Sequence, residues 1–255
     1  MKPVIFSIIA VGALCGGLLF GACNTLYGND TLTIDTSNNT KGFAVVELFT
    51  SEGCSSCPPA DKLLATLAQQ SNGKPLYVLA YHVDYWDHQG WKDAFSQHKF
   101  SERQQDYAQY LRSGVYTPQA VVNGSTEFIG SNAGDMQDAV GKALDENGTY
   151  QLSLTGKVEA QQLTVNYATN ATGKAKLVVA FVRKNGTSNV KAGENVGRKL
   201  SHVQIVEQLT AVELGKNREI VLPLPADFNA ANFELIGFVQ RNQDWHIVAA
   251  AKINF

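Results

Sequence analysis

The sequence predicts an α/β domain followed by an all-β, sandwich-like domain, preceded by an export signal. Three observations predict this order. The N-terminus is an apolar run; alternating strand and helix patterns fill residues 43–148; and residues 149–255 contain short apolar stretches with period-two alternation and frequent turns. The 255 residues are enough for one large domain or two ordinary ones.

The composition is that of an ordinary globular protein, with 44% hydrophobic and 17% charged residues. The formal net charge of -2 provides no basic excess to neutralise a phosphate backbone, so we expect no nucleic-acid partner. The sequence contains neither a phosphate-binding glycine loop nor a G-x-S-x-G nucleophile motif. We expect no cofactor.

Residues 1–23 are predicted to be a signal peptide or a lipoprotein signal, because an apolar run from Val4 to Ala22 follows Lys2. Small residues before Cys23 resemble the bacterial lipobox, which implies lipidation at this cysteine. A cleaved signal and an uncleaved membrane anchor are the alternatives. The polar residues 24–42 suit a linker, and the chain is expected to be periplasmic or extracellular, with a membrane tether as an option.

Only two of the four cysteines, Cys54 and Cys57, belong to the mature globular part. Cys15 and Cys23 fall in the targeting segment. An exported protein meets an oxidising compartment, so a disulfide between Cys54 and Cys57 can persist. Two cysteines are too few for a disulfide scaffold.

The first domain begins with a short apolar run from Phe43 to Phe49, predicted to be a buried strand. A helix follows the cysteines and ends near Asn72, with an apolar stripe of Ala60, Leu63, Leu64, Leu67 and Ala68. Leu76–Val83 is apolar on both parities, as in a central strand of a parallel sheet covered on both faces.

The rest of this domain is predicted to contain a helix over Ser101–Arg112, with Ser101 and Gln104 at capping-box spacing. A hairpin follows, with one strand over Ala120–Val122 and a second through Phe128 and Ile129. Asn132 opens a final helix that stops near Asn147. The second domain is predicted to have about seven strands, centred on Tyr150–Leu154, Leu163–Tyr167, Leu177–Val182, Val203–Leu209, Ile220–Leu224, Phe233–Val239 and Ile247–Ile253.

The cysteine pair Cys54-Ser55-Ser56-Cys57 lies at the predicted start of a helix, where backbone N–H groups and the helix dipole stabilise a thiolate. A second cysteine two residues further on can resolve the mixed disulfide that the first one forms. Cys54 is therefore the candidate nucleophile and Cys57 the candidate resolver. A C-x-x-C pair also occurs in zinc sites and in structural staples.

The order strand, Cys54-x-x-Cys57, helix, and then Thr117-Pro118 just before a strand resembles the thioredoxin superfamily. This resemblance implies that the first domain is thioredoxin-like. It implies a cis peptide bond at Pro118 that lies against the cysteine pair, and it implies that Thr117 offers backbone hydrogen bonds to a substrate.

Three stretches carry a narrower resemblance: Glu47–Asp61 (ELFTSEGCSSCPPAD), His82–Asp87 (HVDYWD) and Gly193–Arg198 (GENVGR). Together they resemble an uncharacterised family of secreted thioredoxin-like proteins, a domain of unknown function, from about Phe43 to the C-terminus. The family implies fold and export and assigns no substrate.

Pro58 and Pro59 distinguish this pair from ordinary thioredoxin sites. Proline is tolerated only in the first helical turn, so the regular helix is expected to begin at about Ser56 or Cys57. Cys54 then lies in the preceding loop. Whether the pair oxidises, reduces or isomerises is left open.

Three further candidates accompany the pair. His82 ends a predicted central strand near Asp84, and it either tunes a thiolate or ligates a metal, or is held by ordinary local hydrogen bonds. Trp86 forms either an aromatic wall beside the pair or part of the core. Gly193–Arg198, followed by His202, is either a binding loop or a turn-rich connection.

We therefore predict a thiol–disulfide oxidoreductase that acts on the thiols or disulfides of exported proteins. The predicted catalytic residues are Cys54, Cys57 and Pro118, and the predicted substrate-binding residues are Thr117, His82 and Trp86. One alternative is a non-catalytic binding module with a structural disulfide. The other is a copper or zinc carrier that uses the two thiolates and His82, although no residue is assigned as a metal ligand.

Overall fold

The computed structural model describes residues 42–215 and 218–255. In these residues the helices are α1 (Pro58–Gln70), α2 (His98–Leu111) and α3 (Ala133–Asp145), with a 3-10 turn at Asp87–Gln89. The strands are β1 (Ala44–Thr50), β2 (Leu76–His82), β3 (Gln119–Val122), β4 (Thr126–Ile129), β5 (Leu152–Glu159), β6 (Gln162–Thr169), β7 (Ala175–Asn189), β8 (Lys199–Glu213), β9 (Glu219–Pro223), β10 (Phe233–Arg241) and β11 (Ile247–Asn254).

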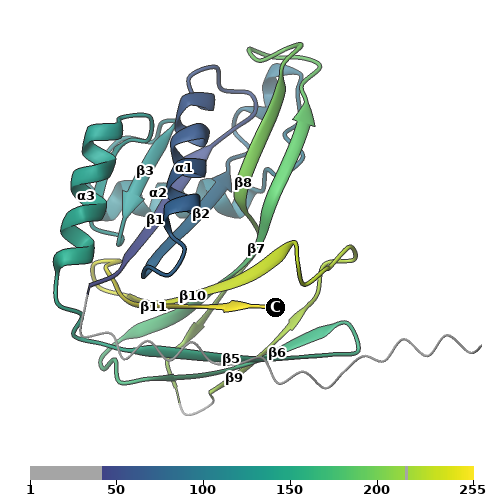
Figure 1. Cartoon of the computed structure of the whole chain (residues 1–255). Helices are drawn as coiled ribbons and strands as arrows, with labels where there is room; N and C mark the ends of the chain where they lie inside the picture. Colours follow the sequence, from purple (N-terminus) through teal and green to yellow (C-terminus); the bar gives the residue numbers. More distant parts are fainter. Residues whose placement is uncertain (1–41, 216–217) are drawn as a thin grey trace, which may run out of the picture. The chain divides into compact units, whose positions relative to one another are not determined.

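Eight of these strands form one mixed sheet in the order β11-β10-β7-β8-β2-β1-β3-β4 (Figure 1). Strand β1 pairs in parallel with β2, and β2 pairs in parallel with β8 at Ala80 and Ile205. The other pairs in this sheet are antiparallel. A separate antiparallel sheet has the order β5-β6-β9. Strands from both halves of the chain therefore belong to the same large sheet.

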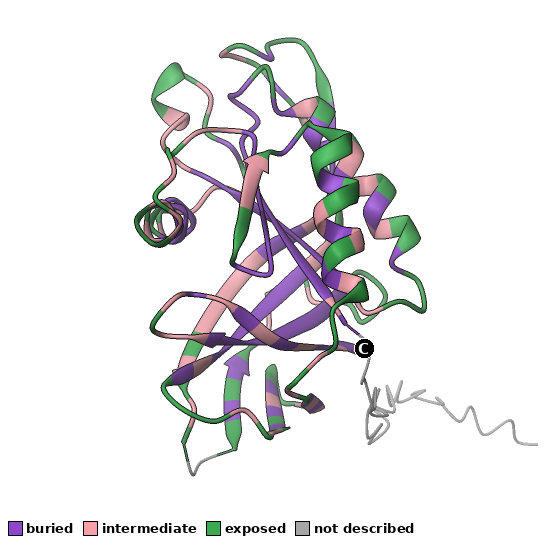
Figure 2. Ribbon diagram, turned by 90° about the vertical axis from the view of Figure 1, so that its left-hand side faces the viewer, coloured by how far each residue is buried: buried purple, intermediate pink, exposed green. Residues whose placement is uncertain are grey.

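Three apolar cores hold these layers together. Helices α1 and α3 cover one face of β1, β2 and β3. On the opposite face, α2 packs against those strands together with residues of β7, β8 and β10. The other face of β7, β10 and β11 packs against the small sheet. Strands β1 and β2 are buried along their whole length, whereas β5 alternates between buried and partly exposed positions (Figure 2).

The expected fold class, a thioredoxin-like α/β domain followed by an all-β sandwich, is wrong. The structure described is mostly β, with three α-helices, and β8 joins the C-terminal strands to β2 in a single mixed sheet. The expected parallel sheet contains only two parallel pairings in the described residues. The pairing of β2 with β8 joins residues more than one hundred positions apart, and the local patterns of the sequence carry no signal for it.

The individual elements agree better with the sequence. All seven strands expected after residue 149 are present, and the helices after the cysteines and after Asn132 are confirmed. Helix α2 begins at His98, so Ser101 and Gln104 lie inside it and do not form the expected capping box. The expected boundary at residue 148 falls between α3 and β5 and stays a prediction.

The signal and linker over residues 1–42 lie outside the described residues, apart from Gly42. None of the helices in the described part of the chain is both long enough and apolar enough to cross a membrane.

A buried ion pair ties three elements of the central core together. Arg103 on α2 donates from Nε to Oε1 of Glu47 on β1 at 2.7 Å, and from Nη1 to Gln240 on β10 at 3.2 Å. The Tyr107 hydroxyl also donates to Glu47. The Arg103 guanidinium lies over four aromatic rings, those of Tyr81, Tyr107, Phe238 and Trp245. This pair fixes how α2 and the two halves of the sheet meet.

Removal of one partner of this pair is expected to cost more stability than removal of both. Arg103→Met leaves the Glu47 carboxylate buried without its cation, and we expect it to lower the free energy of unfolding by about 3 kcal/mol. Arg103→Met combined with Glu47→Gln should recover most of this loss. Urea unfolding of both variants measures it; equal losses in the single and double variants would contradict the interpretation.

Candidate functional site

The cysteine pair lies in the loop between β1 and α1. Pro58 and Pro59 occupy the first two positions of α1, where missing N–H groups are tolerated, and Cys57 is the N-cap. The helix begins at Pro58, one residue after the later of the two expected starts, Ser56 and Cys57. Cys54 and Cys57 form a disulfide and are fully buried.

Exposed serine side chains flank the cysteine pair on one side. On the other side, the pair is flanked by residues that are distant in the sequence. Ser55 and Ser56 are exposed, and the Ser56 hydroxyl lies 3.3 Å from Cys54 Sγ. The Thr117 carbonyl oxygen lies 3.8 Å from the same sulfur, and the Thr117–Pro118 peptide bond is cis, as the resemblance implies. Cys54 Sγ is thus contacted by one serine side chain and by the segment that leads into β3.

Trp86 also belongs to this border. Its indole Nε1 donates to Thr117 Oγ1 at 2.8 Å. A Cβ atom on Gly53 would lie 3.0 Å from Trp86 Cβ, so the glycine permits this close approach. Trp86 therefore holds Thr117 in place next to the cysteine loop.

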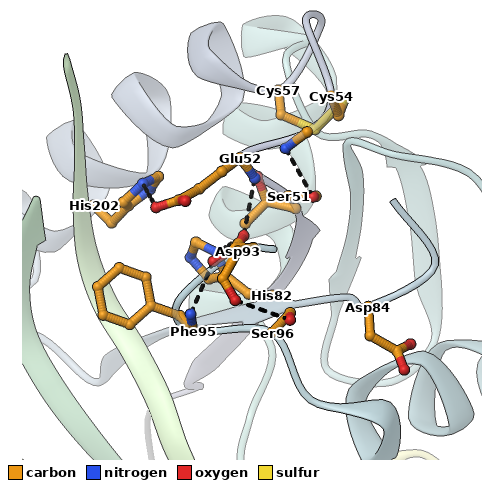
Figure 3. A network of polar contacts seen from close by, with 12 residues as sticks. Ser51, Glu52, Cys54, Cys57, His82, Asp84, Asp93, Phe95, Ser96 and His202 are labelled. Carbon is orange, nitrogen blue, oxygen red and sulfur yellow. Dashed lines mark hydrogen bonds and ion pairs between the residues drawn. A yellow bond between two sulfur atoms is a disulfide. The ribbon is translucent and has the colours of Figure 1, made fainter. Parts of the chain in front are cut away.

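A cluster of buried ionisable side chains lies beneath the disulfide (Figure 3). His202 on β8 bridges two carboxylates: its Nε2 lies 3.2 Å from Glu52 Oε1 and its Nδ1 lies 3.7 Å from Asp61 Oδ2. Glu52 accepts a hydrogen bond from Trp91 Nε1 at 2.7 Å, and Asp61 accepts one from the Thr50 hydroxyl at 2.8 Å. Glu52 precedes the cysteine pair in the chain, and Asp61 follows it on α1.

His82 and Asp93 form a second pair in the same cluster. His82 Nδ1 lies 2.6 Å from Asp93 Oδ2, and both side chains are buried. Burial alone would lower the pKa of His82, but the Asp93 carboxylate raises it above its usual value. Burial would raise the pKa of Asp93, but His82 and the N–H groups of Glu52 and Phe95 hold it below its usual value. Each member of the pair therefore favours the charged form of the other.

Asp61 differs from Asp93. Desolvation raises its pKa, although His202, His82 and the Thr50 hydroxyl act in the opposite direction. Four buried polar atoms of the cluster lack a well-oriented hydrogen-bond partner: Glu52 Oε1, His82 Nε2, and both ring nitrogens of His202. Such atoms are rare in native structures and are found where protons move or ligands bind.

The tip of the β7–β8 hairpin closes the site from the other side. Asn195 is fully buried, and its Nδ2 donates to the carbonyl oxygens of Glu52 and Cys54, each at 2.9 Å. The Glu194 carboxylate accepts a hydrogen bond from the Ser55 N–H at 2.9 Å. The Gly193–Arg198 segment is thus packed directly against the cysteine loop.

The structure brings together five of the six expected site residues: Cys54, Cys57, Thr117, Pro118 and Trp86. His82 lies in the buried cluster, and its Nδ1 faces Asp93. Asp84 is directed to Ser101 and His98 and does not contact His82 in the described contacts. These residues stay predictions as a catalytic set.

The sequence analysis missed Glu52, Asp61 and Asp93 as members of the site, and it named His202 only as the residue that follows the Gly193–Arg198 segment. Asp61 alone had a local signal, because it follows Cys57 by one helical turn on a buried face. In the two described ranges, no group of three or more His, Cys, Asp or Glu side chains is positioned to hold a metal ion.

Comparison with known proteins gives a family but no activity. Residues 45–240 match a family described as "Protein of unknown function (DUF1223)". A crystal structure of a protein from Agrobacterium tumefaciens, a structural-genomics target, is 30% identical, with a TM-score of 0.64 over 82% of this chain and 93% of that one. HBP35 of Porphyromonas gingivalis is 14% identical, with a TM-score of 0.58 over 85% of this chain and 76% of that one, and is similar in fold alone. No curated protein matches the sequence.

The His82–Asp93 pair predicts a pH-dependent stability. The His82 contribution is complete below the unfolded pKa of about 6.5 and is lost as the pH rises through the higher folded value. The Asp93 contribution is present above about pH 3.9 and is lost as the pH falls through the lower folded value. Asp93→Asn should therefore lower the free energy of unfolding most between about pH 4 and 6.5, by about 3 kcal/mol, and less at pH 9.

Urea unfolding at pH 5.5 and pH 9 measures this difference. Asp138→Asn, the same substitution at an exposed position of α3, is the control and should have little effect at either pH. An equal loss at both pH values for Asp93→Asn would contradict the ionised pair.

Proposed function

We propose that this chain, which belongs to the DUF1223 family of proteins of unknown function, is an exported thiol–disulfide oxidoreductase that uses Cys54 and Cys57. The observation that carries the proposal is the position of the disulfide. It lies at the first turn of α1, between exposed serines and a buried cluster of ionisable groups.

The short spacing of the two cysteines supports an exchange role. The disulfide links residues only three positions apart, and the entropic stabilisation from a disulfide is smallest for such short loops. The local order of β1, the cysteine pair and α1 is also the order in which the thioredoxin superfamily carries exchange chemistry. This local likeness supports the chemistry.

The proposed reaction starts from the dithiol form. The Cys54 thiolate attacks one sulfur of a target disulfide and releases the other target sulfur as a thiolate. Cys57 then loses its proton and attacks Cys54 Sγ, which restores the disulfide and releases the second target thiolate. The two electrons pass from the cysteine pair to the target, and every step is reversible.

Asp61 is the proposed acceptor of the Cys57 proton. It follows Cys57 by four residues on α1, and its N–H donates to the Cys57 carbonyl at 3.1 Å. Residues at this spacing lie on the same helix face. Desolvation raises the pKa of the Asp61 carboxyl, which makes it a better proton acceptor than an exposed carboxylate. His202, on its other side, can pass the proton toward Glu52.

The proposed partners are the thiols or disulfides of other exported proteins. The apolar run at Val4–Ala22 supports export, and Cys23 supports a lipid tether. The proposed location is the periplasm or the cell exterior, where disulfides form and are rearranged.

A second candidate function is a binding module in which the disulfide is a structural staple. The complete burial of Cys54 and Cys57 favours it, because a substrate sulfur must make contact with one of their sulfur atoms. Exchange therefore requires the residues around the pair to move and expose a sulfur atom, and the reactivity of the pair decides between the two candidates.

Cysteine variants separate the two functions. With oxidised glutathione, reduced Cys57→Ser should accumulate a mixed disulfide at Cys54, because the resolving thiol is missing. Cys54→Ser should accumulate much less, and either substitution should lower insulin reduction by roughly two orders of magnitude. Intact-protein mass spectrometry detects the adduct. No adduct at Cys54 in the folded protein would support the staple.

Asp61→Asn is expected to slow exchange by about tenfold below pH 8 and to have little effect near pH 9, where the Cys57 thiol ionises without a base. The raised pKa of Asp61 means that its ionised form destabilises the folded state, and this penalty grows as the pH rises through the folded value. The variant should therefore be more stable than the natural chain at pH 8 and similar at pH 4.

Insulin reduction and urea unfolding across this pH range test both expectations. A rate that is lowered equally at all pH values would assign Asp61 a purely structural role. Asp138→Asn again provides the exposed control.

A further inference from the structure

The hairpin tip places a carboxylate on the cysteine loop. Glu194 is exposed, and its Oε2 accepts the Ser55 N–H at 2.9 Å. This hydrogen bond holds the pKa of Glu194 below its usual value, so the group is charged at neutral pH. Asn195, fully buried next to it, fixes the tip through its two bonds to the loop carbonyls. The negative charge is therefore held in place beside Cys54.

The start of α1 provides unusually few backbone donors for a thiolate. Pro58 and Pro59 have no N–H group. The Cys57 N–H donates to the Cys54 carbonyl at 3.2 Å, and the N–H groups of Ala60 and Asp61 donate to the Cys57 carbonyl. The N–H groups of Pro58 and Pro59 are thus absent, and those of Cys57, Ala60 and Asp61 are directed at carbonyl oxygens, while the Ser56 hydroxyl remains 3.3 Å from Cys54 Sγ.

The surroundings of the pair are also rich in negative charge. Glu52 lies beneath it (Figure 3), Asp61 follows Cys57 by one turn of α1, and the Glu194 carboxylate accepts the Ser55 N–H. The groups that face these carboxylates are the Arg198 guanidinium, whose Nη1 donates to Asn195 Oδ1 at 2.7 Å, the His202 ring between the two buried carboxylates, and His82, which is paired with Asp93. A thiolate formed at Cys54 would therefore be repelled by nearby carboxylates and poorly stabilised by backbone donors.

We propose that Glu194 and the proline-blocked helix start set the direction of exchange, so that the disulfide form is favoured and the dithiol form acts as an electron donor to exported protein disulfides. Pairs that oxidise their targets have a strongly stabilised thiolate in the reduced state, and this site has the opposite design. The inference rests on the proposed function. It adds the direction of electron transfer and the substrate class, which is the disulfides of exported proteins.

The electron balance requires a supply of reductant. Each turnover converts one target disulfide into two thiols and converts the Cys54/Cys57 dithiol into a disulfide. A reduced dithiol protein must then transfer two electrons and two protons back to the pair. The proposed reductant of the Cys54/Cys57 disulfide is therefore a protein dithiol.

The experiment compares exchange equilibrium constants of the full chain with glutathione. Glu194→Gln should shift the equilibrium toward the dithiol by about two- to fivefold, because it removes the charge but retains a hydrogen-bond acceptor for Ser55. Glu194→Asp should keep most of the natural value, and added salt should reduce the difference between Glu194→Gln and the natural chain. Glu159→Gln removes the same charge from β5 and should change nothing.

Pro59→Ala provides a second, independent variant. It restores one N–H at the second position of α1 and should shift the equilibrium in the same direction as Glu194→Gln. Equilibrium constants that are unchanged in both variants, or that shift toward the disulfide, would overturn the inference. The proposed function would still stand. A pair that does not exchange at all in the folded natural chain would overturn both.

Discussion

Two hydrogen bonds from one buried amide organise the site. Asn195 donates to the carbonyl oxygens of Glu52 and Cys54, and these bonds lock the cysteine loop to the tip of the β7–β8 hairpin. An unpaired carbonyl or amide in this buried position would cost about 1–3 kcal/mol, so the arrangement is strongly preferred. The hairpin reaches this point because β8 pairs with β2 and each of its strands has 15 residues. The same hairpin delivers His202 to the buried cluster.

The cluster beneath the disulfide is costly for the fold. Glu52, Asp61, His82, Asp93 and His202 are removed from water together, and several of their polar atoms lack well-oriented partners. A buried ionic group is weak evidence for stability, because well-packed apolar residues of similar size often stabilise as much. The Glu47–Arg103 pair has better geometry and serves the core. The cluster that contains Glu52 and His202 lies under a cysteine pair instead, and this position favours a role in proton movement.

The sequence predicted the local elements and the centre of the site, because both depend on short-range patterns. The C-x-x-C pair, the start of α1 to within a residue or two and the Thr117–Pro118 segment follow from neighbouring residues and from the resemblance. The sheet order, and with it the fold class, was not accessible, because it depends on β8 pairing with β2. The contacts of Asn195 and His202 could not be predicted for the same reason, because each contact joins segments more than a hundred residues apart.

The reduction potential of Cys54/Cys57 in the folded chain tests the central claim most directly. The pair is equilibrated with a graded series of dithiol buffers, and the reduced fraction is counted by alkylation and mass spectrometry. A reversible equilibrium with a potential above about -300 mV and near that of dithiol electron donors, about -270 mV, is the result that we predict. A pair that stays oxidised below about -300 mV until the chain unfolds would contradict exchange and would make the disulfide a structural staple.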